Sequence, residues 1–134
     1  MTEENKKSAP INLLLIDDEQ EFVNVLSKRL AKRDILTTKA YSGKEGIHAL
    51  RDQHFDVAVL DLKMGDIDGI EVLKILKTMD PQMPVIMLTG HGSQEAARDG
   101  LEAGAFDYLT KPYDLHELVG KIFSAVKREA RPQA

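Results

Sequence analysis

Short apolar runs recur along this chain, and the segments between them have the spacing of amphipathic helices. The clearest runs occupy residues 13–16, 57–60 and 85–88. After the first run, Phe22, Leu26 and Leu30 recur every fourth residue, which places them on one face of a helix. Apolar runs that alternate with helical periods are typical of strand and helix repeats over a parallel sheet. The sequence therefore predicts an α/β fold.

Five pairs of a strand and a helix fit the chain. The expected strands cover residues 12–16, 35–41, 55–60, 85–88 and 105–109, and the expected helices cover residues 19–32, 42–52, 70–80, 93–103 and 115–128. The second strand alternates only weakly, so we expect it at an edge of the sheet. Ser42 and Glu45 have the spacing of a helix capping box. We expect one domain over residues 11–128, with disordered tails at residues 1–10 and 129–134.

Two of the expected helices differ in how much apolar surface they offer. The helix at residues 93–103 has Leu101 as its one bulky apolar residue, so we expect it to be held loosely. The last helix carries a full apolar stripe that should dock on the sheet. The stripe consists of Leu115, Leu118, Val119, Ile122, Phe123 and Val126.

Composition excludes several kinds of site and partner. The 134 residues contain no cysteine, which excludes disulfides, thiolate zinc sites and cysteine nucleophiles. No stretch approaches the roughly 20 apolar residues of a membrane helix, and the N-terminus has no apolar signal region, so we expect a soluble cytoplasmic protein. A net charge of −4 without a Lys/Arg block argues against direct binding of nucleic acid. The histidines His48, His54, His91 and His116 lack metal-ligand spacing.

Polar side chains follow the ends of the expected strands. Asp17 and Asp18 follow the first strand, and Asp61 follows the third. Thr89 and Lys111 follow the fourth and fifth strands. Because parallel neighbouring strands end at the same edge of a sheet, these groups should converge there. Three carboxylates facing one lysine and one hydroxyl suit a divalent cation and a phosphoryl group.

Over residues 11–127 the sequence resembles the receiver domains of bacterial two-component response regulators, the CheY-like superfamily. The matching motifs, in order, are LLIDDE at residues 14–19, DLKM at 61–64, DG at 68–69, LTG at 88–90 and GAFDYLTKP at 104–112. This resemblance implies a flavodoxin-like, doubly wound fold. It would have five parallel strands in the order 2-1-3-4-5, flanked by five helices.

The resemblance also implies a reaction. Asp61 would accept a phosphoryl group from a phosphohistidine of a sensor histidine kinase or a histidine phosphotransfer protein. Asp18, Asp61 and the backbone carbonyl of Lys63 would coordinate Mg²⁺, and Asp17 would act through a metal-bound water. The hard, oxygen-only ligand set is the one that Mg²⁺ prefers. Lys63 and His91 would overhang the phosphoryl group and influence how quickly it is hydrolysed.

The resemblance further implies contacts that form only after phosphorylation. Lys111 would bind one phosphoryl oxygen, while the Thr89 hydroxyl and the Gly90 amide would hold another. Thr89, drawn towards the phosphate, would vacate space that Tyr108 can fill. The helix from Ser93, the Tyr108 strand and the last helix would then present a face that binds an effector or a second copy of the chain.

Other interpretations of the same residues remain open at this point. Asp17 and Asp18 could cap the first helix, Lys111 could be an ordinary turn lysine, and Tyr108 could be a plain strand residue. A phosphohydrolase of the haloacid dehalogenase type would also use Mg²⁺ and an aspartate nucleophile, although it expects a second aspartate where Glu19 stands. A flavodoxin-like carrier of FMN would share the strand order. A receiver-like domain that only docks partners is a further alternative.

Overall fold

The apolar runs of the sequence form strands, and the periodic segments form helices. The computed structural model describes residues 9–90 and 93–130. Along these residues the elements are β1 (Ile11–Ile16), α1 (Gln20–Ala31), β2 (Ile35–Ala40), α2 (Gly43–Asp52), β3 (Val57–Asp61), α3 (Gly69–Met79), β4 (Val85–Thr89), α4 (Gln94–Glu102), β5 (Asp107–Thr110) and α5 (Leu115–Ala130).

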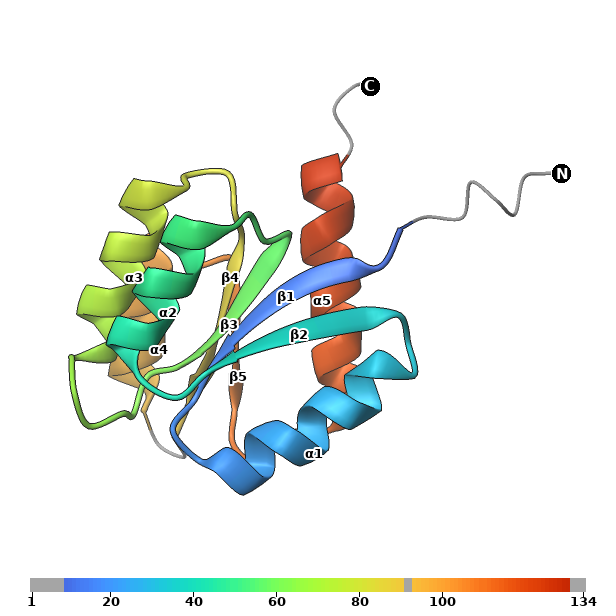
Figure 1. The fold of residues 1–134 in the computed structure, drawn as a ribbon. Helices are drawn as coiled ribbons and strands as arrows, with labels where there is room; N and C mark the ends of the chain where they lie inside the picture. Colours follow the sequence, from blue (N-terminus) through green and yellow to red (C-terminus); the bar gives the residue numbers. More distant parts are fainter. Residues whose placement is uncertain (1–8, 91–92, 131–134) are drawn as a thin grey trace, which may run out of the picture.

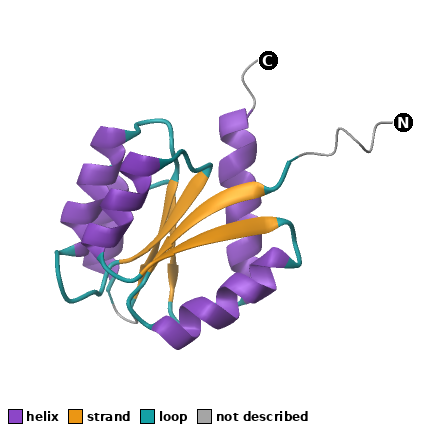
Figure 2. Ribbon diagram, in the orientation of Figure 1, coloured by secondary structure: helices purple, strands orange, loops and turns teal. Residues whose placement is uncertain are grey.

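The strands of the described residues form one parallel sheet between two layers of helices. Their order is β2-β1-β3-β4-β5, so β2 lies at an edge as expected. Helices α1 and α5 cover one face of the sheet, and α2, α3 and α4 cover the other (Figure 1). Figure 2 shows the same sandwich coloured by secondary structure. The predicted doubly wound α/β fold is confirmed.

The core consists of two apolar layers, one on each face of the sheet. In β1, Leu13 and Leu15 pack into the layer that contains α1 and α5. Leu14 and Ile16 pack into the layer that contains α2 and α3. Because both faces of the sheet are covered, the central strands are apolar at successive positions rather than alternating. This explains the uninterrupted runs in the sequence.

The element boundaries differ from the predicted ones by a few residues. β3 includes Asp61 and β4 includes Thr89, so both site residues belong to the last position of a strand. α5 continues to Ala130, which is two residues beyond the expected end of the domain. The expectations for residues 1–8 and 131–134 lie outside the described residues. None of the helices in the described ranges combines the length and apolar character that crossing a bilayer requires.

The start of α2 shows half of the predicted capping box. The Ser42 hydroxyl accepts a hydrogen bond from the Glu45 amide at 3.1 Å, as expected. The Glu45 carboxylate, however, accepts from the amide of Tyr41 at 2.8 Å, one residue before the cap. The Asp66 carboxylate also accepts from the amides of Gly43 and Lys44. The loop after β3 is thereby tied to the N-terminus of α2.

α4 docks on the sheet through two small residues. Its buried residues are Ala97 and Gly100, whereas Leu101 is 42% exposed. A Cβ atom at Gly100 would overlap the sulfur of Met87 in β4, so the glycine leaves space for the end of the Met87 side chain. The small contact agrees with the expected weak packing of α4. Its mobility stays a prediction.

α5 docks on the sheet with a narrower stripe than predicted. Leu118, Ile122 and Ala125 are fully buried against the sheet. Phe123 was expected in this stripe, but it is 45% exposed. The prediction was wrong for Phe123 because the buried face of α5 follows Leu118, Ile122 and Ala125, and Phe123 lies beside that face.

Candidate functional site

Three carboxylates meet at the C-terminal edge of the sheet. Asp17 directly follows β1, and Asp61 ends β3, which pairs with β1 so that Ile16 lies opposite Leu60. Asp17 is fully buried, Asp61 is 4% exposed and Asp18 is exposed. Each of the three offers a carboxylate oxygen within 4.8 Å of the others. The predicted convergence of this aspartate cluster (Asp17, Asp18 and Asp61) is confirmed.

Lys111 reaches the aspartate cluster from the far edge strand. Its backbone amide donates to the carbonyl of Thr89 at 2.8 Å, which fixes the start of the β5–α5 loop beside β4. The Lys111–Pro112 peptide bond is cis. The Lys111 ammonium lies 3.2 Å from Asp17 Oδ2 and 3.4 Å from Asp61 Oδ2. The interpretation of Lys111 as an ordinary turn lysine does not account for these contacts.

Both buried carboxylates are held from two sides. Asp17 Oδ1 accepts a hydrogen bond from the Glu19 amide, and Asp61 Oδ1 accepts one from the Lys63 amide, each at 3.0 Å. In both residues the other oxygen, Oδ2, faces the Lys111 ammonium. The amides therefore fix the rotation of the two carboxylates, while the ammonium bridges them.

The electrostatics of the site follow from burial and from like charges in close proximity. Burial raises the pKa of the Asp17 carboxyl, and the charge of Asp61 adds to this effect. The Glu19 amide and the Lys111 ammonium oppose it without cancelling it. Burial alone would lower the pKa of Lys111, but its attraction to Asp17 and Asp61 outweighs burial and raises that pKa. The site thus carries negative charge that one ammonium does not neutralise.

Replacing Asp17 by asparagine is expected to raise the Tm of the metal-free protein at neutral pH. A raised carboxyl pKa means that the native state binds the proton more tightly than the unfolded chain, so the ionised form costs stability above the native pKa. The neutral amide avoids this cost and can still accept from the Glu19 amide. The gain should shrink as the pH falls towards about 4, the ordinary aspartate pKa. Thermal unfolding in EDTA at several pH values measures it, and a lower Tm of the variant at neutral pH would contradict the argument.

The aspartate cluster has the chemistry of a site for a hard divalent cation. Its donors are carboxylate oxygens alone, which suit Mg²⁺ or Ca²⁺ better than softer metals. Two buried carboxylates around one ammonium leave negative charge that a bound cation would offset. Asp18, which is exposed, gives this site access to solvent. The residues present therefore fit the Mg²⁺ that the sequence predicts.

Of the remaining predicted residues, Lys63 contacts the cluster through its backbone amide, whereas Thr89 and Tyr108 form their hydrogen bonds elsewhere. Thr89 is buried at the end of β4, and its hydroxyl donates to the carbonyl of Leu109 at 3.4 Å. Gly90 follows it, and Tyr108 is 37% exposed on β5. Within residues 9–90 and 93–130, no hydrogen bond links Thr89 or Tyr108 to the three aspartates. Lys63 is exposed, and His91 lies outside the described residues.

Sequence reasoning missed three residues around Lys111. The Glu19 carboxylate lies 3.4 Å from the ammonium, and the centre of the Phe22 ring lies 5.0 Å from it. Tyr113 packs edge-on against Phe22 with ring centroids 6.2 Å apart. Glu19 and Tyr113 could have been found because each is within two residues of a predicted site residue. The sequence pattern places Phe22 in the core stripe of its helix, which gives no sign of a contact with Lys111.

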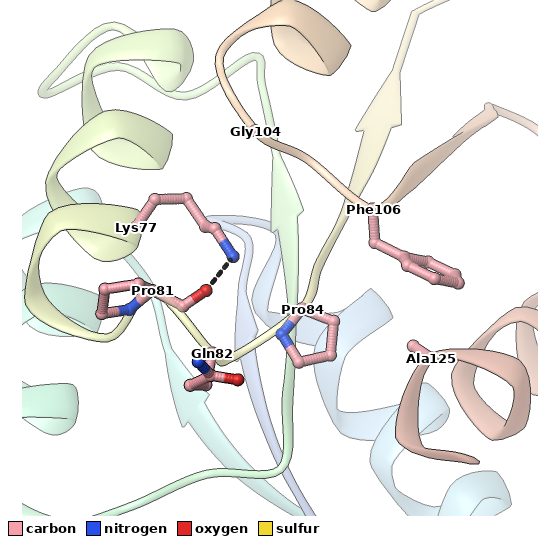
Figure 3. Close-up of a pocket in the computed structure, with 7 residues that line it drawn as sticks. All are labelled: Lys77, Pro81, Gln82, Pro84, Gly104, Phe106 and Ala125. Carbon is pink, nitrogen blue, oxygen red and sulfur yellow. Dashed lines mark hydrogen bonds between the residues drawn. The ribbon is translucent and has the colours of Figure 1, made fainter. Parts of the chain in front are cut away.

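A separate cavity lies at the N-terminal ends of β4 and β5, whereas the aspartate cluster lies at the C-terminal ends of the strands (Figure 3). It has a volume of about 270 Å³, and its lining includes Lys77, Pro84 and Phe106. The Lys77 ammonium donates to the carbonyls of Pro81 and Met83, both at 2.9 Å, and thereby holds the α3–β4 loop. Among the described residues, the aspartate cluster is the one acidic group that could hold a metal ion. We therefore take the aspartate cluster, and not this cavity, as the candidate functional site.

Sequence comparison gives a family and several regulators as relatives. The sequence model of the response regulator receiver domain matches residues 13–123. The regulatory protein AtoC of Escherichia coli is 38% identical over 106 residues, which are 79% of this chain and 23% of that protein. The transcriptional regulatory protein GlrR of E. coli is 36% identical over 121 residues, which are 90% of this chain and 27% of that protein. The chain spans about a quarter of the length of these relatives.

Solved structures agree with the sequence comparison. The receiver domain of Francisella response regulator 1452 superposes with a TM-score of 0.82 at 35% identity, covering 88% of this chain and 98% of that one. A CheY-like receiver domain protein from Methanospirillum hungatei gives a TM-score of 0.85 at 28% identity, covering 90% and 96%. Fold, acidic edge and sequence match thus agree, and the chain belongs to the response regulator receiver domain family of two-component systems.

Proposed function

We propose that Asp61 is the phosphoacceptor of a two-component phosphorelay that acts in the cytoplasm. The observation that carries this proposal is the placement of Asp61 Oδ2 3.4 Å from the Lys111 ammonium, within the aspartate cluster. The donor would be a phosphohistidine of a sensor histidine kinase or of a histidine phosphotransfer protein. A carboxylate oxygen of Asp61 attacks the phosphorus, the P–N bond breaks, and the imidazole leaves with the electron pair.

The ligands proposed for Mg²⁺ are Asp18, Asp61 and the backbone carbonyl of Lys63, with Asp17 acting through a bound water. When bound, Mg²⁺ supplies positive charge that offsets the negative charge of the transferring phosphoryl oxygens. The chain's own part is to orient the acceptor. The Lys63 amide fixes the rotation of the Asp61 carboxylate, and the Lys111 ammonium stabilises charge that develops beside it.

The proposed switch uses contacts that differ between the two states. Before phosphorylation, Lys111 is shared among carboxylates, and the Thr89 hydroxyl donates to Leu109. An aspartyl phosphate would draw Lys111 to one phosphoryl oxygen, and Thr89 with the Gly90 amide to another. Only such a difference in interaction can shift a conformational equilibrium. Tyr108 would then turn inward from its exposed position.

The output face of the switch is proposed to lie on α4, β5 and α5. Among the side chains that the structure describes, each of these elements carries one that is large, apolar and exposed, namely Leu101, Tyr108 and Phe123. Such residues are commonly buried on binding a partner, either an effector or a second copy of the chain. The relative GlrR is a transcriptional regulatory protein more than three times as long as this chain, so control of DNA by another part of the protein is part of the proposal.

Incubation with acetyl phosphate and Mg²⁺ tests the proposed function. Intact mass spectrometry should show one phosphoryl adduct per chain, and excess EDTA should prevent its formation because the transferring charge is then not offset. The protein should not turn over a phosphate ester such as p-nitrophenyl phosphate. Steady turnover of the ester would favour the haloacid dehalogenase alternative. Absence of any adduct with Mg²⁺ present would contradict the phosphoacceptor role.

A further inference from the structure

The Lys111 ammonium rests against an aromatic ring as well as against carboxylates. The centre of the Phe22 ring lies 5.0 Å from Lys111 Nζ, which is within the range of a cation–π interaction. Phe22 belongs to the first turn of α1, directly after the loop that carries Asp17 and Asp18. It is half-buried, and the Lys111 side chain is 27% exposed. Water is therefore partly excluded from the contact, and a cation–π interaction is strengthened by this exclusion.

Tyr113 holds the Phe22 ring in place from its edge. The two ring planes lie at 81°, the edge-to-face arrangement that aromatic pairs favour. Among the described residues the Tyr113 hydroxyl is buried without a hydrogen-bond partner, and the side chain is held by packing against Phe22 and the core. The pair joins α1 to the loop that carries Lys111. The Lys111 ammonium therefore contacts a ring from α1, and that ring is held by Tyr113 of the loop that carries Lys111.

We infer that Phe22 is a positioning residue for Lys111, whose ring holds the ammonium beside Asp61 during phosphoryl transfer. This inference rests on the proposed function. A lysine is a point charge on a flexible stem, so its place depends on what surrounds it. The carboxylates of Asp17, Glu19 and Asp61 lie at 3.2 to 3.4 Å from the Lys111 Nζ. These distances are longer than the usual 2.7–2.9 Å of a charge-assisted hydrogen bond. The carboxylates alone therefore do not fix the ammonium.

An aromatic face suits this task better than a further carboxylate would. The ring attracts the cation but is not a conventional acceptor, so it leaves the ammonium's hydrogens free for the phosphoryl oxygens. Its attraction acts over the whole face of the ring rather than at a single acceptor atom. Lys111 can therefore shift from Asp17 and Asp61 to a phosphoryl oxygen while remaining on the ring.

Phe22 also lines a surface groove, which gives a competing explanation of any effect. The groove has a volume of about 190 Å³ and lies between α1 and the start of α5. Val25 and Arg29 line it on the same side as Phe22, and Tyr113 and Leu115 line the other side. A phosphodonor protein that fits this groove would contact Phe22 directly. Acetyl phosphate as the donor removes this possibility, because no protein partner is then present. Val25→Ala is the matched control, since Val25 lines the same groove and is 54% exposed.

The test measures the initial rate of adduct formation with acetyl phosphate and Mg²⁺ by intact mass. Phe22→Leu should lower this rate about five-fold, which corresponds to about 1 kcal/mol, a typical cation–π interaction. Phe22→Met, of similar volume and also without a ring, should behave alike and replaces the leucine variant if that one fails to fold. Phe22→Tyr should restore a rate within about two-fold of the wild type, because its ring binds cations as well. Val25→Ala should leave the rate unchanged.

The role of Lys111 in the effect is checked by a double-mutant cycle. In a Lys111→Ala background, Phe22→Leu should have no further effect on the rate. The inference is overturned if wild type is labelled and both ringless variants match its rate, or if Phe22→Leu slows labelling equally in the two backgrounds. Failure of wild type to form the adduct would instead overturn the proposed function, and the inference with it.

Discussion

Replacing Asp61 by asparagine is expected to abolish phosphoryl labelling by acetyl phosphate and Mg²⁺. The amide has nearly the shape of the carboxylate and can still accept from the Lys63 amide, so the fold should be retained. It lacks the anionic oxygen that attacks phosphorus. Intact mass spectrometry should show the wild type with one adduct and the variant with none.

The control for this experiment is Asp68→Asn. Asp68 is an exposed residue that precedes α3 in the same loop, and its side chain makes no capping hydrogen bond. Asp68→Asn changes the net charge by the same amount as Asp61→Asn, but Asp68 does not belong to the aspartate cluster. Asp68→Asn should label like the wild type. An adduct of equal stoichiometry on Asp61→Asn would show that another residue accepts the phosphoryl group.

Replacing Asp18 by alanine is expected to weaken Mg²⁺ binding at least about ten-fold. Replacing a residue that only orients a metal ligand commonly lowers metal affinity 10- to 100-fold. Replacing the proposed ligand Asp18 should lower the affinity at least as much. Asp18 is the exposed member of the cluster, so its loss should disturb the fold little. Isothermal titration calorimetry with MgCl₂ measures the dissociation constant.

Glu19→Ala separates metal ligation from general electrostatics. Glu19 is adjacent to Asp18 and its removal changes the net charge equally, but its carboxylate contacts Lys111 and lies outside the cluster. Loss of one nearby exposed charge should weaken binding by only about two- to three-fold. Equal effects of Asp18→Ala and Glu19→Ala would mean that Asp18 acts through its charge alone.

The strand-end residues could be predicted because their position depends on topology. Asp17, Asp61 and Lys111 each occupy the last position of a parallel strand or follow it, and such positions share one edge of the sheet. No knowledge of side-chain packing was needed for this. The predicted meeting of the carboxylates and the lysine is accordingly confirmed.

The residues on helices were harder to predict, because a helical period gives a face but not its width. Phe22 shares its period with Leu26 and Leu30, yet it lies at the rim of the core, where it packs on Tyr113. Phe123 shares the period of α5 and is largely exposed. How far a helix overhangs the edge of its sheet decides such cases, and this is a tertiary property that the local pattern does not contain.

A crystal structure with Mg²⁺ and beryllofluoride tests the central claim most directly. The claim is that the aspartate cluster binds a cation and presents Asp61 to a phosphoryl group. The structure should show beryllium bonded to an Asp61 carboxylate oxygen, Mg²⁺ in contact with Asp18 and Asp61, and the Lys111 ammonium on a fluorine. Beryllofluoride bound elsewhere, or Mg²⁺ bound away from these carboxylates, would contradict the account.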